Sequence, residues 1–170
     1  MSKSAWPVYA GIVWSVLFAL MSFYWAAGGM LGVLSLGGQI YERALTREPD
    51  FLALVWITGL IKVGGALLLA AMLRRRPYER KWIGQGLYYA GFIGGLLIAL
   101  YGLLNFSTIL MSILGILELS IDSYAKYWRL LFWEPFWIVG GVLYVMASKR
   151  YRNNRLRNPR SPEQRPHAKA

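Results

Sequence analysis

Charged residues are absent from long stretches of the chain, and these stretches alternate with short polar segments. Residues 4–41 and 82–117 contain no charged residue, while residues 51–73 and 130–148 contain one each, Lys62 and Glu134. A hydrocarbon core of about 30 Å requires about 20 helical residues. A helix also satisfies its own backbone groups in lipid. We therefore predict four membrane-spanning helices, at about residues 7–28, 51–73, 82–104 and 128–147.

Two of the uncharged stretches are longer than one span. Residues 30–45 stay mildly apolar after the first span, and residues 105–108 (Asn-Phe-Ser-Thr) after the third have the composition of a turn with helix-capping residues. We expect a short interfacial helix in each stretch, on the outer side. The alternative is that the spans extend past the membrane. The fold class is all-α, a four-helix transmembrane bundle with short interfacial segments.

The distribution of basic residues predicts the orientation. Residues 74–81 and the segment after Ser148 are strongly basic, whereas the two other connections carry about as many acids as bases. By the positive-inside rule the basic segments lie in the cytoplasm. We expect both termini in the cytoplasm, which four spans allow. A cleaved signal peptide is the rival interpretation of the first span, but that span has one preceding lysine and a long apolar stretch.

The amino-acid composition indicates a membrane protein and excludes several kinds of metal and cofactor site. Of the 170 residues, 56% are apolar and 16% are charged, against about 25% charged in a typical soluble domain. Because the chain has no cysteine, disulfides, thiolate metal sites and iron–sulfur clusters are excluded. Its single histidine, His167, lies in a polar tail. We expect no metal and no cofactor, and no nucleophile constellation is visible.

Residues 149–170 differ from the membrane domain, residues 1–148. They contain three prolines, many arginines and few apolar side chains, so they cannot bury enough surface to fold. We expect a disordered basic cytoplasmic tail, either simply solvated or attached to anionic membrane lipid. Nucleic acid is not an expected partner, because topology explains the net charge of +11 and no stacking platform accompanies it.

Small residues recur every three or four positions in the first and third spans. Such stripes let transmembrane helices approach closely. They indicate tight packing within the chain or, alternatively, the seam of a homodimer. The stripes are Gly11, Ser15, Ala19, Ser22, Ala26 and Gly29, and Gly84, Gly91, Gly95, Ala99 and Gly102.

Two ionisable residues within the spans need a partner, because a charge near the bilayer centre is costly. Lys62 is near the middle of the second span, and Glu134 precedes Pro135 near the outer end of the fourth. Opposite charge and matching depth predict a Lys62–Glu134 ion pair. The pair is either structural, fixing helix register, or the polar centre of a ligand or proton site. A third alternative is that the two groups do not pair.

Three motifs, FYWAAGG (residues 23–29), TGLIK (58–62) and WEPFW (133–137), occur in order. Together they resemble a family of small four-span bacterial membrane proteins of unknown function, over about residues 8–148. The resemblance implies four helices and a bacterial origin, and thus the cytoplasmic (inner) membrane. It implies no activity.

Two classes of function fit these observations. The first is a non-enzymatic membrane protein that binds a small amphiphile or a partner membrane protein. Its outer pocket would lie over the Lys62–Glu134 pair and be lined by Tyr24, Trp25, Trp56, Trp133 and Trp137. The alternative is a proton-linked small carrier or a membrane-embedded enzyme that uses the same pair. The lack of an internal repeat disfavours a carrier, and catalysis needs more acid–base groups.

Overall fold

The protein is built from helices joined by short connections. The computed structural model describes residues 5–74 and 81–157, and no strand occurs in these two ranges. The elements in order are α1 (Trp6–Ala26), the 3₁₀ turn η1 (Val33–Ser35), α2 (Gly38–Thr46), α3 (Pro49–Ala71), α4 (Lys81–Ile113), α5 (Ser123–Trp128), the π-helical turn η2 (Arg129–Trp133) and α6 (Glu134–Arg157).

Four helical stretches are long and apolar enough to cross a membrane by length and composition. They are α1, α3, α4 and the continuous stretch from α5 through η2 into α6. The predicted all-α fold with four spans is therefore confirmed. These helices indicate a multi-pass membrane protein, because such lengths match the thickness of a bilayer.

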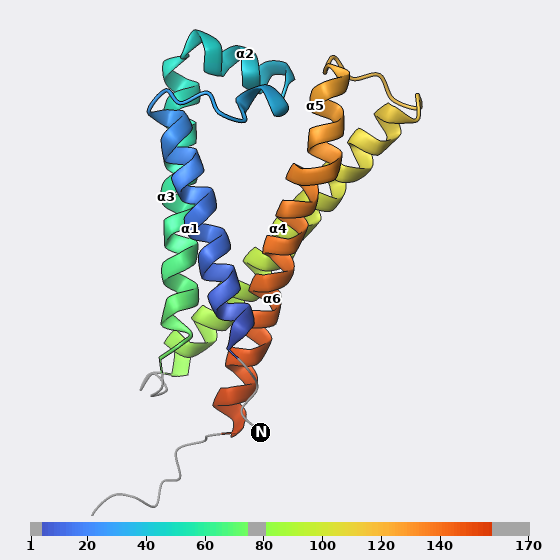
Figure 1. Cartoon of the computed structure of the whole chain (residues 1–170). Coiled ribbons are helices and arrows are strands. Elements are labelled where there is room, and N and C mark those ends of the chain that lie inside the picture. Colours follow the sequence, from blue (N-terminus) through green and yellow to red (C-terminus); the bar gives the residue numbers. More distant parts are fainter. Residues whose placement is uncertain (1–4, 75–80, 158–170) are drawn as a thin grey trace, which may run out of the picture.

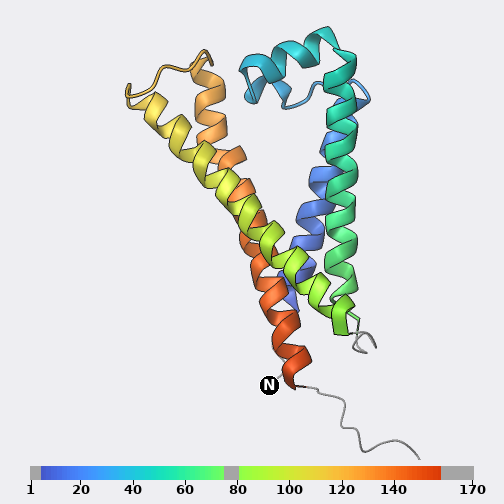
Figure 2. The same cartoon turned by 180° about the vertical axis from the view of Figure 1, so that it is seen from behind.

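The spans form two pairs. Helix α1 packs along α3, helix α4 packs along α6, and contacts between α1 and α6 join the pairs. The pairs lie close together at the end where α1 begins and α6 ends, and they diverge toward the end that carries α2 and α5 (Figures 1 and 2). We refer to these as the terminal end and the α2/α5 end.

Small residues allow the close approach within and between the pairs. The stripe on α1 from Gly11 to Ala26 is buried within the chain. Where α4 crosses α6, a Cβ atom added to Gly95 would lie 2.8 Å from the carbonyl oxygen of Gly141. A side chain larger than hydrogen would force the two backbones apart. In this structure, both stripes therefore serve packing within the chain.

Although the helix pairs diverge, the turns η1 and η2 are in contact at the α2/α5 end. Trp133 of η2 donates an indole hydrogen bond of 2.8 Å to the hydroxyl of Ser35 in η1. Beside it, Gly37 has a φ of 62°, and a Cβ there would meet the side chain of Ala125 in α5. Glycine is therefore needed at residue 37 for both conformation and space.

The prediction of a turn at residues 105–108 is wrong. Helix α4 continues through it to Ile113. The side chains of Asn105, Ser107 and Thr108 each donate a hydrogen bond to the carbonyl four residues earlier, at 2.8–2.9 Å. They thus satisfy their polar atoms inside the helix instead of ending it. In contrast, the expected short helix after the first span exists as α2.

The C-terminal end of the fourth span also differs from the expectation. Helix α6 continues past Ser148 to Arg157, and Tyr151 in this extension is buried. The remainder of the expected tail, residues 158–170, lies outside the described residues, as do residues 75–80 of the basic connection.

Candidate functional site

Lys62 extends from α3 toward α1. It is half-buried and shares a helix face with the buried Gly59 and Ala66. Its Nζ donates a hydrogen bond of 2.7 Å to Oγ of Ser22, which in turn donates to the carbonyl of Phe18 at 3.1 Å. Ser22 lies one turn before the end of α1. The ammonium therefore reaches toward the α2/α5 end, where α3 begins. This direction is expected, because helical side chains lean toward the N-terminus of their helix.

Aromatic rings cover the ammonium. Nζ of Lys62 lies 4.1 Å from the ring centroid of Phe18 and 5.7 Å from that of Trp137. These two rings contact each other edge to face, with centroids 4.6 Å apart. A cation over a desolvated aromatic face gains about 0.5–2 kcal/mol. Ser22, Phe18 and Trp137 thus bring α1 and α6 together around a lysine of α3, and we call these four residues the Lys62 site.

Glu134 belongs to a separate polar cluster on the other helix pair. Its carboxylate is 3% exposed and forms an ion pair of 2.8 Å with the guanidinium of Arg129, together with a 2.9 Å hydrogen bond from Nε. Arg129 also donates to Oδ1 of Asn105 in α4 at 3.3 Å. A buried carboxylate of this kind requires a charged, hydrogen-bonded partner, and Arg129 supplies it.

The expected direct pair between Lys62 and Glu134 is not present in the structure. Each group has another partner: Glu134 binds Arg129, and Lys62 binds the hydroxyl of Ser22. Among residues 5–74 and 81–157, no carboxylate forms an ion pair with Lys62. The reason is local, because the π-helical turn aligns Arg129 with Glu134 while Lys62 faces the α1 side of the bundle.

The five tryptophan and tyrosine residues expected to line one pocket lie in different surroundings. Trp133 contacts Trp25, with ring centroids 5.6 Å apart, and both lie near η1. Trp137 belongs to the Lys62 site. Trp56 packs instead on Phe23, at 5.3 Å, in the α1–α3 contact. Tyr24 is 45% exposed and accepts a hydrogen bond from the backbone of Leu31.

Sequence reasoning missed the partners of both ionisable groups. The sequence indicated Ser22 only as a small residue of the α1 stripe, and nothing in the sequence indicated that Phe18 contacts Lys62. Arg129 lies five residues before Glu134, a spacing at which side chains do not meet on an α-helix. Pro135 was the available signal, since proline disturbs the regular hydrogen-bond ladder of a helix.

The described part of the chain contains no group of three histidine, cysteine or acidic side chains that could hold a metal ion. What the Lys62 site offers is an ammonium group, a hydroxyl and aromatic faces. This set of groups can bind an anion that has an apolar body. The Ser22 hydroxyl accepts from Lys62 and donates to the carbonyl of Phe18. Its proton is therefore not directed at the lysine, as it would be in a serine activated by an adjacent base.

A family model described as "Protein of unknown function (DUF3995)" matches residues 15–144. The chain belongs to this family. The matched DUF3995 segment contains the whole Lys62 site and the Arg129–Glu134 pair, and it ends before the last turns of α6. No curated protein and no solved structure matches the chain.

Proposed function

We propose that this DUF3995 protein is a non-enzymatic membrane protein that binds a small amphiphile with an anionic head group at the Lys62 site. The observation that carries the proposal is the surroundings of the Lys62 ammonium. It lies within a span and has a hydroxyl and two rings beside it, but no carboxylate partner in the described residues. An intramembrane charge without a counter-charge is costly unless a ligand supplies one.

The hydrogen-bonding capacity of Lys62 supports a ligand. An ammonium group has three donors, and Ser22 accepts from one of them. The two remaining donors fit the oxygens of a carboxylate or phosphate. The rings of Phe18 and Trp137, which flank the ammonium, would pack against the first part of the ligand's hydrocarbon chain.

The alternative of a proton-linked carrier or a membrane enzyme has less support. It requires Lys62 and Glu134 to exchange protons within one site. Because Glu134 is already bound to Arg129 and Lys62 to Ser22, the geometry favours binding over shared proton chemistry.

We also propose the cytoplasmic membrane of a bacterium as the location, with both termini in the cytoplasm. The terminal end carries Arg74, Lys81 and the basic last turns of α6, and the positive-inside rule assigns such an end to the cytoplasm. The Lys62 ammonium then opens toward the outer half of the membrane.

The proposal is tested with the purified full chain in a neutral detergent, using oleate as the probe and oleyl alcohol as its uncharged match. We expect oleate to raise the thermal unfolding temperature and oleyl alcohol to have little effect. Lys62→Met should abolish the oleate effect, and Lys62→Arg should retain part of it. Lys126→Met, the same change on α5 outside the site, is the matched control.

Three outcomes would contradict the proposal. Equal stabilisation by oleyl alcohol would show that the charge is not recognised. An undiminished oleate effect in Lys62→Met would place the ligand elsewhere. An oligomer that depends on Lys62 and ignores oleate would identify a partner subunit as the occupant.

A further inference from the structure

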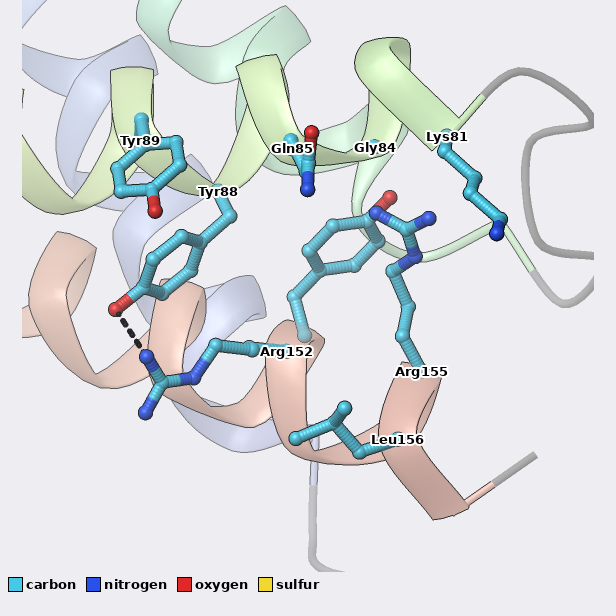
Figure 3. A pocket seen from close by; sticks show the side chains of 9 residues that line it. Lys81, Gly84, Gln85, Tyr88, Tyr89, Arg152, Arg155 and Leu156 are labelled. Carbon is cyan, nitrogen blue, oxygen red and sulfur yellow. Dashed lines mark hydrogen bonds between the residues drawn. The ribbon is translucent and has the colours of Figure 1, made fainter. Parts of the chain in front are cut away.

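A second polar site lies at the terminal end, between the start of α4 and the end of α6. There the structure contains a cavity of about 330 Å³ (Figure 3). Three cationic side chains line it, Lys81 from α4 and Arg152 and Arg155 from α6, and no acidic residue is among its described lining residues. This cavity is at the opposite end of the molecule from the α2/α5 end, so it is independent of the Lys62 site.

Aromatic side chains position the two arginines. Arg152 donates a hydrogen bond of 3.0 Å to the hydroxyl of the buried Tyr88, and its guanidinium lies 4.9 Å from the centre of that ring. In Figure 3, the hydroxyl of Tyr88 and the guanidinium of Arg152 point toward each other. Arg155 lies 5.8 Å from the ring of Tyr151. Guanidinium groups held in this way lose less side-chain freedom when they bind a ligand.

The absence of a side chain at Gly84 makes room for Arg155. A Cβ atom added to Gly84 would collide with the guanidinium of Arg155, which lies directly against α4 at this point. The position of this cation in the cavity therefore depends on a glycine on the facing helix.

The charges of the cavity have no counter-charge within the described part of the chain. Neither Lys81, Arg152 nor Arg155 forms an ion pair with a carboxylate of residues 5–74 or 81–157. Like charges around one cavity repel each other, and an anion bound between them removes this repulsion. The cavity is thus complementary to an anion.

The surroundings of the cavity indicate that the anion carries hydrocarbon. Its rim includes Leu156, which is 71% exposed, and Tyr89, which is 57% exposed. Trp82, beside it on α4, is also exposed, as expected of a residue at the membrane–water interface. Cationic groups next to apolar, membrane-facing groups match the head group and the first methylenes of a lipid.

We propose that this cavity binds the phosphodiester head group of an anionic membrane lipid, with Arg152 and Arg155 contacting the phosphate and the acyl chains following α4. Basic pockets between transmembrane helices on the cytoplasmic side are suited to such head groups. Arginine also matches phosphate geometry through paired N–H donors.

The test uses the full chain, delipidated and exposed to phosphatidylglycerol, to phosphatidylcholine or to inorganic phosphate, with lipid binding followed by native mass spectrometry. We expect phosphatidylglycerol to bind in preference to phosphatidylcholine. The double variant Arg152→Gln, Arg155→Gln should weaken phosphatidylglycerol binding by roughly tenfold or more. Lys149→Gln removes a charge from the same end of α6 outside the cavity and should weaken binding clearly less, per charge removed, than the double variant.

A second pair of variants distinguishes binding in the cavity from attraction of the lipid by the overall charge of the protein. Gly84→Ala leaves every charge in place but displaces the guanidinium of Arg155, so we expect it to weaken phosphatidylglycerol binding. Gly86→Ala is its matched control, because nothing lies within 4 Å of a Cβ at Gly86. The proposal is overturned if Lys149→Gln weakens binding, per charge removed, as much as the double variant. It also fails if Gly84→Ala binds like Gly86→Ala, or if inorganic phosphate displaces phosphatidylglycerol at equal concentration, which would identify a soluble anion as the ligand.

Discussion

Arg129 and Glu134 form a 2.8 Å ion pair across a single π-helical turn. The backbone N–H of Glu134 donates to the carbonyl of Arg129, five residues earlier. This wider turn stacks two side chains that an α-helix would place on different faces. Arg129 thereby neutralises the buried carboxylate of Glu134.

This pairing predicts a specific pattern of coupling between mutations. Arg129→Gln alone and Glu134→Gln alone should each destabilise the protein, by about 3–5 kcal/mol, because each leaves an uncompensated buried charge. The double variant should recover much of the loss. Reversible unfolding in mixed detergent measures the free energy of each variant.

The matching cycle of Lys62→Met with Glu134→Gln should be additive, within about 0.5 kcal/mol, since the two groups have separate partners. Strong coupling in that second cycle, with none between Arg129 and Glu134, would show that the lysine and the glutamate meet after all.

The crossing of α4 and α6 should not tolerate a side chain at its centre. Gly141→Val places methyl groups against the backbone of α4 near Ala99, and overpacking of this kind costs about 1–3 kcal/mol or more. Gly94→Val is the control on α4, because a Cβ there has nothing within 4 Å. Thermal unfolding of both variants checks the prediction, and equal losses would mean that the crossing is not close-packed.

Two truncated chains should distinguish the contribution of the end of α6 to stability from that of the residues beyond it. A chain that ends at Arg157 should keep its thermal stability. A chain that ends at Ser148 should lose about 1.5–3 kcal/mol, because it removes Tyr151, which is buried against the bundle. A stable chain ending at Ser148 would contradict the packing role of this extension.

Reporter fusions test the orientation. A fluorescent protein fused after Ala170 should be active, because it folds in the cytoplasm, and alkaline phosphatase inserted at Arg47 should be active, because it needs the outer side. The reverse pattern would invert the topology derived from the basic segments.

The sequence by itself determined the number of spans and their approximate positions. Long uncharged stretches suffice for this, because the hydrocarbon core has a fixed thickness that requires about 20 consecutive apolar residues per helix. It also identified Lys62 and Glu134 as the ionisable residues to explain, since any charge within a span has a cost that must be offset. The small residues of α1 and α4 likewise predicted the packing faces that are buried in the structure.

Only the tertiary structure decided which groups meet. Depth and charge favoured a Lys62–Glu134 pair, but contact also depends on the rotation of each helix and on local departures from α-helical geometry. The π-helical turn directs Arg129 to Glu134, and Lys62 is left to Ser22 and two aromatic rings. The basic cavity was equally invisible in the sequence, because it brings Lys81 together with arginines about seventy residues later, and only the packing of α4 against α6 places them around one space.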